Sequence, residues 1–199
     1  MAETGHQRVC LIACGALARE ILAVIDANGL DHVELRCLSA LLHNRPERIP
    51  DAVREAIQTA RTDGFDRILI GYADCGTGGL LDTVIEEEGV ERIGGPHCYA
   101  FFSGTERFLK DQEEVFTAFF LTDFLARQFD SIIYGPLGLE KHPELRDLYF
   151  GNYDRVIYLA QTEDPELDLK ARQAAEKLGL AFERRSTGYG ELTDFVRSA

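Results

Sequence analysis

The chain has 199 residues, of which 45% are hydrophobic and 28% are charged. These proportions are those of an ordinary globular protein, and they exclude collagen, coiled coils and extended disorder. The formal net charge of −13 would repel the nucleic-acid backbone, so we expect no nucleic-acid partner. No stretch is long and apolar enough for a membrane span, and residues 1–8 lack the pattern of a signal peptide. We therefore expect a cytoplasmic protein that makes no membrane contact.

The first part of the chain alternates between short apolar runs and segments with helical spacing. The predicted elements are a strand over 9–13, a helix over 16–25, a strand over 33–38, a loop over 42–50, a helix over 51–62 and a strand over 67–72. Asn28-Gly29 is a typical end for the first helix. Strand and helix steps of this length imply parallel pairing with right-handed crossovers.

The same alternation continues to the end of the chain. The predicted elements are a helix over 80–88, a short strand over 90–93, an apolar segment over 99–104, a strand over 115–121, a helix over 124–129 capped by Thr122-Asp123, a short helix over 143–149, a strand over 155–159, a helix over 165–178, a strand over 180–183 and a helix over 192–196. This order predicts an α/β fold, doubly wound, with a mostly parallel sheet and helices on both faces, in a Rossmann-like three-layer arrangement. We expect a single domain over residues 1–199, with an internal boundary near 94–103 between two pseudo-symmetric halves.

The stretch from Arg67 to Leu81 combines a buried strand, a glycine-rich turn and the start of a helix. Such a turn lies at the carboxyl end of a strand, where open α/β sheets place their ligands. Gly76, Gly78 and Gly79 could let backbone N–H groups approach an anion at the start of the helix. Their spacing matches neither G-x-G-x-x-G nor a P-loop. The alternatives are therefore a binding site for a small ligand and a tight turn that needs positive φ.

Three of the five cysteines directly follow predicted strands, namely Cys14, Cys75 and Cys98. At the carboxyl edge of a parallel sheet these positions can approach one another around a crevice. Three thiolates with one imidazole or water suit zinc or an iron–sulfur cluster. Any one of these cysteines, taken alone, is equally well explained as a small residue in a tight turn. Together they predict a cysteine-lined metal site that holds a zinc ion or an iron–sulfur cluster.

Two histidines are candidate fourth ligands or acid–base groups, because imidazole titrates near neutral pH. His97 adjoins the third of these cysteines, and His43 lies in the loop after the second strand, where a hydrogen bond that fixes the loop explains it equally well. Asp74 either orients a ligand or caps the glycine turn. Cys10 and Cys37 lie inside apolar strands, so we expect them to be small buried hydrophobic side chains.

Several short motifs together carry a family resemblance. They are Cys14 followed by a helix of small residues, Leu42-His43 with Pro46, Gly71-Tyr72 with Cys75-Gly76 and Gly78, and Cys98 followed by an apolar pair and Ser103-Gly104. Through them the stretch from Val9 to Thr122 resembles the DUF1638 family of bacterial and archaeal proteins of unknown function, and the Gly-Tyr-x-x-Cys-Gly element is the most specific part. The resemblance implies a shared thiol-lined site. Because many members resemble neighbours of corrinoid-dependent methyltransferase systems, it also implies a role in methyl-group or cofactor metabolism.

Three functions remain open at this point. The first is a metal-binding protein, either an enzyme or an accessory protein of corrinoid or methyl-group metabolism, with a small molecule or a corrinoid-related protein as its partner. The second is a module that binds a small anion or a corrinoid-like ligand through the glycine turn, without catalysis. The third is a thiol-based redox or transfer enzyme that uses Cys75 as its nucleophile, which requires a lowered thiol pKa. No feature of the sequence indicates an oligomeric state.

Overall fold

The computed structural model describes residues 7–199, which divide into two compact units. Unit 1 comprises the chain up to Cys98 together with Glu191–Ala199, and unit 2 comprises Tyr99–Gly190. The boundary after Cys98 falls inside the interval 94–103 in which an internal boundary is expected. The expectation of a single domain stays a prediction.

Unit 1 is built on a four-stranded parallel sheet of order β2-β1-β3-β4. Its elements are β1 (Val9–Cys14), η1 (Gly15–Leu17), α1 (Ala18–Asn28), β2 (Val33–Leu38), η2 (Ala40–Asn44), η3 (Pro46–Arg48), α2 (Ile49–Thr62), β3 (Arg67–Gly71), α3 (Leu80–Glu88), β4 (Glu91–Arg92) and α10 (Glu191–Arg197). Gly29 ends α1 in the left-handed conformation that its sequence predicts.

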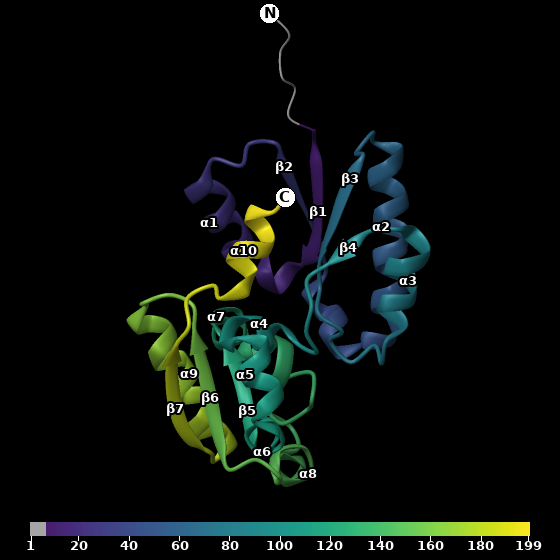
Figure 1. Ribbon diagram of the computed structural model, residues 1–199. Helices are drawn as coiled ribbons and strands as arrows, with labels where there is room; N and C mark the ends of the chain where they lie inside the picture. The colour runs from purple at the N-terminus through teal and green to yellow at the C-terminus, as the bar shows by residue number, and fades with distance from the viewer. Residues whose placement is uncertain (1–6) are drawn as a thin grey trace, which may run out of the picture. The chain divides into compact units, whose positions relative to one another are not determined.

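Helices cover both faces of this sheet. Helices α2 and α3 lie side by side on one face, and α1 and α10 lie on the other (Figure 1). Cys10 and Ile12 of β1 belong to the core cluster beneath α2 and α3, whereas Leu11 alternates to the opposite face and is equally buried. A strand that is buried on both faces has a continuous run of apolar residues in its sequence, and β1 could therefore be predicted from the sequence.

Unit 2 contains a second parallel sheet, of order β5-β6-β7. Its elements are α4 (Cys98–Ser103, whose first residue belongs to unit 1), α5 (Thr105–Lys110), α6 (Gln112–Thr117), β5 (Ala118–Thr122), α7 (Asp123–Arg127), η4 (Asp130–Tyr134), η5 (Pro143–Leu145), α8 (Arg146–Phe150), β6 (Arg155–Ala160), α9 (Pro165–Leu178) and β7 (Ala181–Ser186). The Thr122 hydroxyl accepts a hydrogen bond from the Leu125 N–H, so the predicted helix cap is confirmed.

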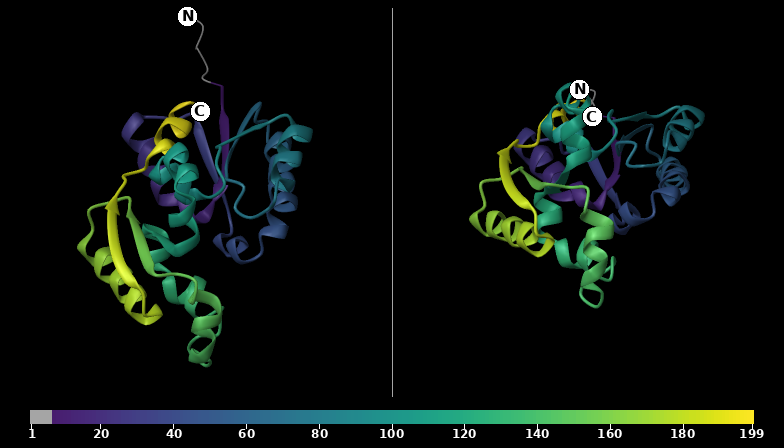
Figure 2. Two further views of the ribbon diagram at one scale, coloured as in Figure 1. Left: turned by 60° about the horizontal axis from the view of Figure 1, so that its bottom comes forward. Right: turned by 90° about the horizontal axis from the view of Figure 1, so that it is seen from below.

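Aromatic side chains pack on both faces of the second sheet. Phe120 stacks on Tyr99 with ring centroids 5.5 Å apart, and Phe119, on the other face, meets the edge of Phe150 at 5.1 Å. Figure 2 shows the yellow-green helix α9 lying along β6 and β7. Both units therefore place a parallel sheet between layers of helices, and the predicted α/β, Rossmann-like class is confirmed.

Two local predictions are wrong. Residues 115–117, predicted as the first part of a strand, instead belong to helix α6, because the Asp111 carboxylate caps that helix by accepting from the Glu114 N–H. Cys37 is exposed rather than buried, because β2 lies at the edge of the sheet and only Val33 of its residues is buried. Cys10, by contrast, is fully buried as expected.

Across residues 7–199 we find no helix that is both long and apolar enough to cross a membrane.

Candidate functional site

The loop after β3 is tied to the loop after β4 by two backbone hydrogen bonds. The Asp74 N–H donates to the Gly95 carbonyl oxygen at 3.0 Å, and the Cys75 N–H donates to the Pro96 carbonyl oxygen at 2.8 Å. Since His97 and Cys98 follow Pro96 directly, these bonds bring both of them to the segment that carries Cys75. The expected meeting of strand ends at one sheet edge is realised here by backbone contacts.

A close approach of β1 and β3 brings Cys14 to the same edge. Gly71, the last residue of β3, pairs in register with Ala13 of β1. A Cβ atom added to Gly71 would lie 2.8 Å from the Ala13 Cβ, which is too short for a normal contact. Glycine is therefore needed at this position, and the residues that follow each strand, Cys14 and Tyr72, lie close together.

The hydroxyl of Tyr72 is buried among thiols. Tyr72 is 2% exposed, and no donor or acceptor among the described residues makes a well-aligned hydrogen bond with its hydroxyl. The pKa of the phenol is raised far above its usual value, first by burial and then by the neighbouring Cys14 and Cys75. A buried polar group without a good partner costs roughly 1–3 kcal/mol, so this hydroxyl calls for an explanation.

Cys75 has an unusual backbone conformation. With φ of 51° it is the one non-glycine residue of positive φ among residues 7–199. Such a conformation costs a residue with a Cβ about 1–2 kcal/mol, and it is found most often at functional sites. The turn continues in the same left-handed region through Gly76, Gly78 and Gly79, whose φ values are 85°, 63° and 87°. The predicted need for positive φ in this turn is confirmed.

The Asp74 carboxylate occupies the inside of the glycine turn. It accepts hydrogen bonds from the Thr77 hydroxyl at 2.6 Å, the Gly79 N–H at 2.9 Å and the Gly78 N–H at 3.2 Å. Burial opposes ionisation, but these hydrogen bonds together lower the pKa of Asp74 below its usual value. Asp74 thus caps the turn, and an external anion would have to displace it to reach the glycine amides.

The two central thiols are protonated at neutral pH. Burial raises the pKa of Cys75 to about 12, the nearby Cys14 adds to this, and a hydrogen bond from the Cys98 N–H opposes it. Burial also raises the pKa of Cys14, against hydrogen bonds from the Ala16 backbone and the Tyr72 hydroxyl group. A catalytic thiolate needs the opposite shift, so this arrangement gives no support to Cys75 as a nucleophile.

The two candidate histidines lie close to each other. Loss of hydration lowers the pKa of His43, which lies on η2, and the neighbouring His97 lowers it further. The pKa of His97 is also lowered by loss of hydration, with the Asp74 charge acting against the shift. Both imidazoles are therefore neutral at pH 7, which is the form that binds metals.

The structure brings the predicted site residues together in pairs rather than as one set. Cys14 lies near Cys75, His43 lies near His97, and Cys98 approaches Cys75 through its backbone N–H. Within residues 7–199 no group of three or more His, Cys, Asp or Glu side chains is arranged to hold a metal ion.

Sequence reasoning named Tyr72 as the end of a strand and as part of the family motif, but missed it as a member of the site. A tyrosine that ends an apolar strand directly before a cysteine-bearing turn is the signal that could have identified it.

Comparison with known proteins places the chain in a family and gives no closer relative. No curated protein and no solved structure matches it. A family model described as a protein of unknown function, DUF1638, matches residues 37–196, which is well over half of the 199 residues. The matched range includes His43, Cys75, His97 and Cys98 and begins after Cys14. The chain belongs to the DUF1638 family.

Proposed function

We propose that the protein binds a metal, as a zinc ion or an iron–sulfur cluster, through the thiolates of Cys14 and Cys75. The single observation that carries this proposal is the pairing of the two thiols beside the buried hydroxyl of Tyr72, which faces Cys14 without a well-aligned hydrogen bond. A thiol pair inside a protein has no evident structural need for a buried hydroxyl next to it. A metal site does, because second-shell hydrogen bonds orient and stabilise metal-bound thiolates.

The properties of the donors fit a metal of this kind. Bound metal deprotonates coordinating thiols outright, so the raised pKa values of Cys14 and Cys75 make binding dependent on pH without preventing it. Once the thiolates form, the Tyr72 hydroxyl gains a strong charge-assisted acceptor. The strained backbone of Cys75 also has a reason, since it holds that side chain at the end of β3.

The remaining ligands would come from His97, His43 or Cys98. His97 and Cys98 are tethered to the Cys75 segment by the hydrogen bond to Pro96, which makes either of them a candidate third ligand. Two thiolates with neutral imidazole form a donor set that zinc accepts readily. Bound zinc with a position open to solvent supplies a Lewis acid, whereas a closed site is structural. The suggested connection with corrinoid or methyl-group metabolism, as an enzyme or an accessory protein, stays a prediction.

Metal analysis of anaerobically purified protein tests the proposal, because an iron–sulfur cluster would be lost in air. We expect stoichiometric zinc, or iron with sulfide, in the unaltered protein. Cys75→Ser should lose at least about nine tenths of the metal, because a hydroxyl is a poor ligand for soft metals. Cys10→Ser is the matched control, since Cys10 is buried inside β1. Its pKa is raised by burial and affected by Arg36 and Glu34 rather than by Cys14 or Cys75, so this variant should lose stability but keep its metal.

Two results would contradict the proposal. One is metal-free protein from a metal-replete preparation in which Cys14 and Cys75 are both freely alkylated after mild unfolding. The other is equal metal content in Cys75→Ser and Cys10→Ser.

A further inference from the structure

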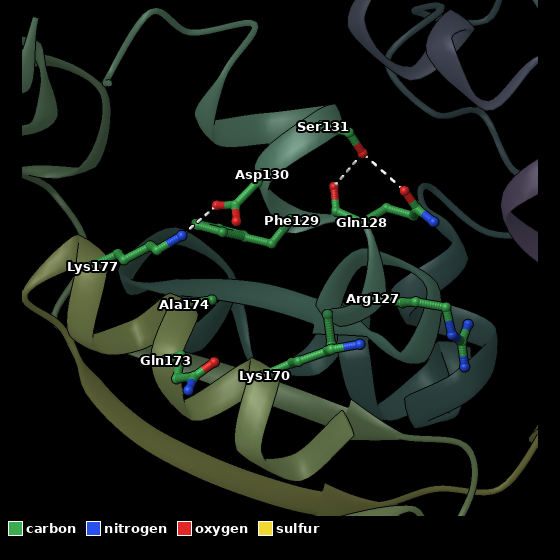
Figure 3. A pocket seen from close by; sticks show the side chains of 10 residues that line it. Arg127, Gln128, Phe129, Asp130, Ser131, Lys170, Gln173, Ala174 and Lys177 are labelled. Atoms are coloured by element: carbon green, nitrogen blue, oxygen red, sulfur yellow. Dashed lines mark hydrogen bonds and ion pairs between the residues drawn. The ribbon is translucent and has the colours of Figure 1, made fainter. Parts of the chain in front are cut away.

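Unit 2 contains a surface pocket between helix α9 and the segment that runs from α7 into η4. Its volume is about 270 Å³. Figure 3 shows Gln128, Asp130 and Ser131 on one side of it and Lys170, Gln173 and Lys177 from α9 on the other, with Arg127 at one end and its guanidinium directed away from Lys177. The pocket belongs entirely to unit 2 and contains none of the proposed metal ligands.

Positive charge dominates this pocket. Its lining includes three cations, Arg127, Lys170 and Lys177, and one carboxylate, Asp130. The local charge of this pocket is therefore opposite in sign to that of the whole chain, whose formal net charge is −13. Because the chain has 21 Lys and Arg against 34 Asp and Glu, a hollow lined by three cations and one carboxylate indicates a local affinity for anions.

The cations of the pocket are available to a ligand. Lys177 pairs with Asp130 at 2.6 Å and Lys170 pairs with Glu166 at 2.7 Å, but the side chains in both pairs are substantially exposed. Exposed pairs of this kind contribute little stability, so an incoming anion can replace the carboxylates at small cost. The Arg127 side chain forms no hydrogen bond or ion pair within the described part of the chain.

The rest of the lining suits a small polar molecule. Ala126, Phe129 and Ala174 are buried and give the pocket a firm apolar floor. Above this floor, the Ser131 hydroxyl bonds to Gln128, and the Gln173 amide lines the α9 side. The volume lies below the usual range for sites that enclose drug-sized ligands, which is roughly 300–1,000 Å³.

We infer that this pocket binds a small, multiply charged anion that carries phosphate or carboxylate groups. The guanidinium of Arg127 presents the planar fork that matches either group, and the ammonium groups of Lys170 and Lys177 supply two further point charges along the pocket (Figure 3). The inference is independent of the metal proposal, because the two sites lie in different units and share no residue.

Titrations followed by amide and arginine side-chain NMR shifts test the inference. Inorganic phosphate and succinate serve as the two probes, with sodium chloride as the reference at the same ionic strength. We expect saturable shifts at Arg127, Gln128, Ser131 and Gln173 with at least one probe, and the probe that binds more tightly identifies the charged group.

Variants of the pocket, with a control variant in a second surface hollow, test which charges bind the anion. Arg127→Gln combined with Lys170→Gln should weaken binding at least about tenfold, because two charge-assisted contacts are lost. Asp130→Asn should strengthen binding, because it removes the competing carboxylate from Lys177. Arg107→Gln with Lys110→Gln is the matched control, since these cations line a hollow in which Glu106 and Asp111 balance their charge.

The inference is overturned if neither probe gives saturable shifts at these four residues. It is equally overturned if the pocket variant binds as tightly as the unaltered protein, or if the control variant weakens binding by the same factor. Unchanged thermal unfolding of the pocket variant would show that its loss of binding is not a loss of folding.

Discussion

The backbone N–H of Cys75 donates a hydrogen bond to the carbonyl oxygen of Pro96 across 2.8 Å. This bond joins the turn after β3 to the segment that carries His97 and Cys98, although more than 20 residues separate them. It involves only backbone atoms, so substitution of any of these side chains should leave it in place. The relationship explains how residues that follow different strands can serve one site, and the predictions below depend on it.

Replacement of Tyr72 by phenylalanine should have opposite effects on the metal-free and metal-bound protein. Without metal, Tyr72→Phe removes a buried hydroxyl that has no good partner, so we expect the free energy of unfolding to rise by up to about 1 kcal/mol. With metal, it removes a donor to the thiolates, so metal affinity should fall about tenfold. Chemical denaturation and competition with a metal chelator measure the two effects.

Tyr158→Phe is the control for that experiment. The Tyr158 hydroxyl donates to the buried Asp123 carboxylate at 2.7 Å, so its removal should cost about 1–3 kcal/mol of stability and leave metal affinity unchanged. Unaltered metal affinity in Tyr72→Phe would remove this hydroxyl from the site.

Metal binding should release protons. The pKa values of Cys14 and Cys75 are both raised, so both thiols are protonated at pH 7 and must lose their protons to bind metal. We expect release of at least two protons per metal, which makes the apparent affinity rise about a hundredfold per pH unit near neutrality. The histidines are already neutral at pH 7 and add nothing to this number. Calorimetry in buffers of different ionisation enthalpy counts the protons, and a count of one or fewer would contradict a two-thiolate site.

Gly71→Ala should disturb the junction of β1 and β3. The added methyl group would lie 2.8 Å from the Ala13 Cβ, so the strands must move apart, at a cost of about 1–3 kcal/mol. Metal content should fall as well, because Cys14 and the Cys75 turn lie just beyond this contact. Gly94→Ala is a suitable comparison, since an added Cβ there meets nothing within 4 Å. Thermal unfolding and metal analysis of both variants test the prediction, which fails if the two behave alike.

The dependence of the free energy of unfolding on pH in the acidic range should depend on the ionisation of Glu114. Arg185 donates from both terminal nitrogens to the Glu114 carboxylate at 2.6 Å each. Hydrogen bonding and charge from Arg185 lower the pKa of Glu114 in spite of partial burial. Because the folded-state pKa is the lower one, this stabilisation is complete above the unfolded value of about 4.3 and is lost as the pH falls through the folded value.

Glu114→Gln should therefore lower stability at pH 7 by about 1–2 kcal/mol and flatten the decline between pH 5 and pH 3. Glu106→Gln is the control, because Glu106 forms an exposed pair with Lys110. Denaturation curves at several pH values measure both variants, and parallel curves for Glu114→Gln and the unaltered protein would contradict the assignment.

Much of the fold could be predicted because buried parallel strands produce continuous apolar runs. The runs that became β1, β3 and β6 have nearly every residue buried, and glycine marks the ends of β1 and β3. The prediction was wrong where the composition of a segment does not match the burial or the secondary structure that the segment has in the fold. Residues 115–117 have strand composition but lie in a capped helix, with Phe116 72% exposed. Cys37 sits in an apolar run of an edge strand, and sequence alone does not tell an edge strand from a central one.

The site could be predicted only as positions along a sheet edge. The spacing of Cys14, Cys75 and Cys98 indicates which strand ends carry thiols, but convergence of the side chains depends on loop hydrogen bonds such as that of Cys75 with Pro96. The Gly78 and Gly79 N–H groups donate to the Asp74 carboxylate, although an external anion would suit them equally well. The pattern of apolar residues in the sequence does not indicate which of these two acceptors they bind.

X-ray absorption spectroscopy at the metal edge of anaerobically purified protein tests the central claim most directly. If Cys14 and Cys75 hold the metal, the spectrum should contain at least two sulfur neighbours at about 2.3 Å, the usual Zn–S distance, and Cys75→Ser should remove one of them or the metal itself. A metal surrounded by nitrogen and oxygen alone, or a sulfur shell that Cys75→Ser leaves unchanged, would contradict the account.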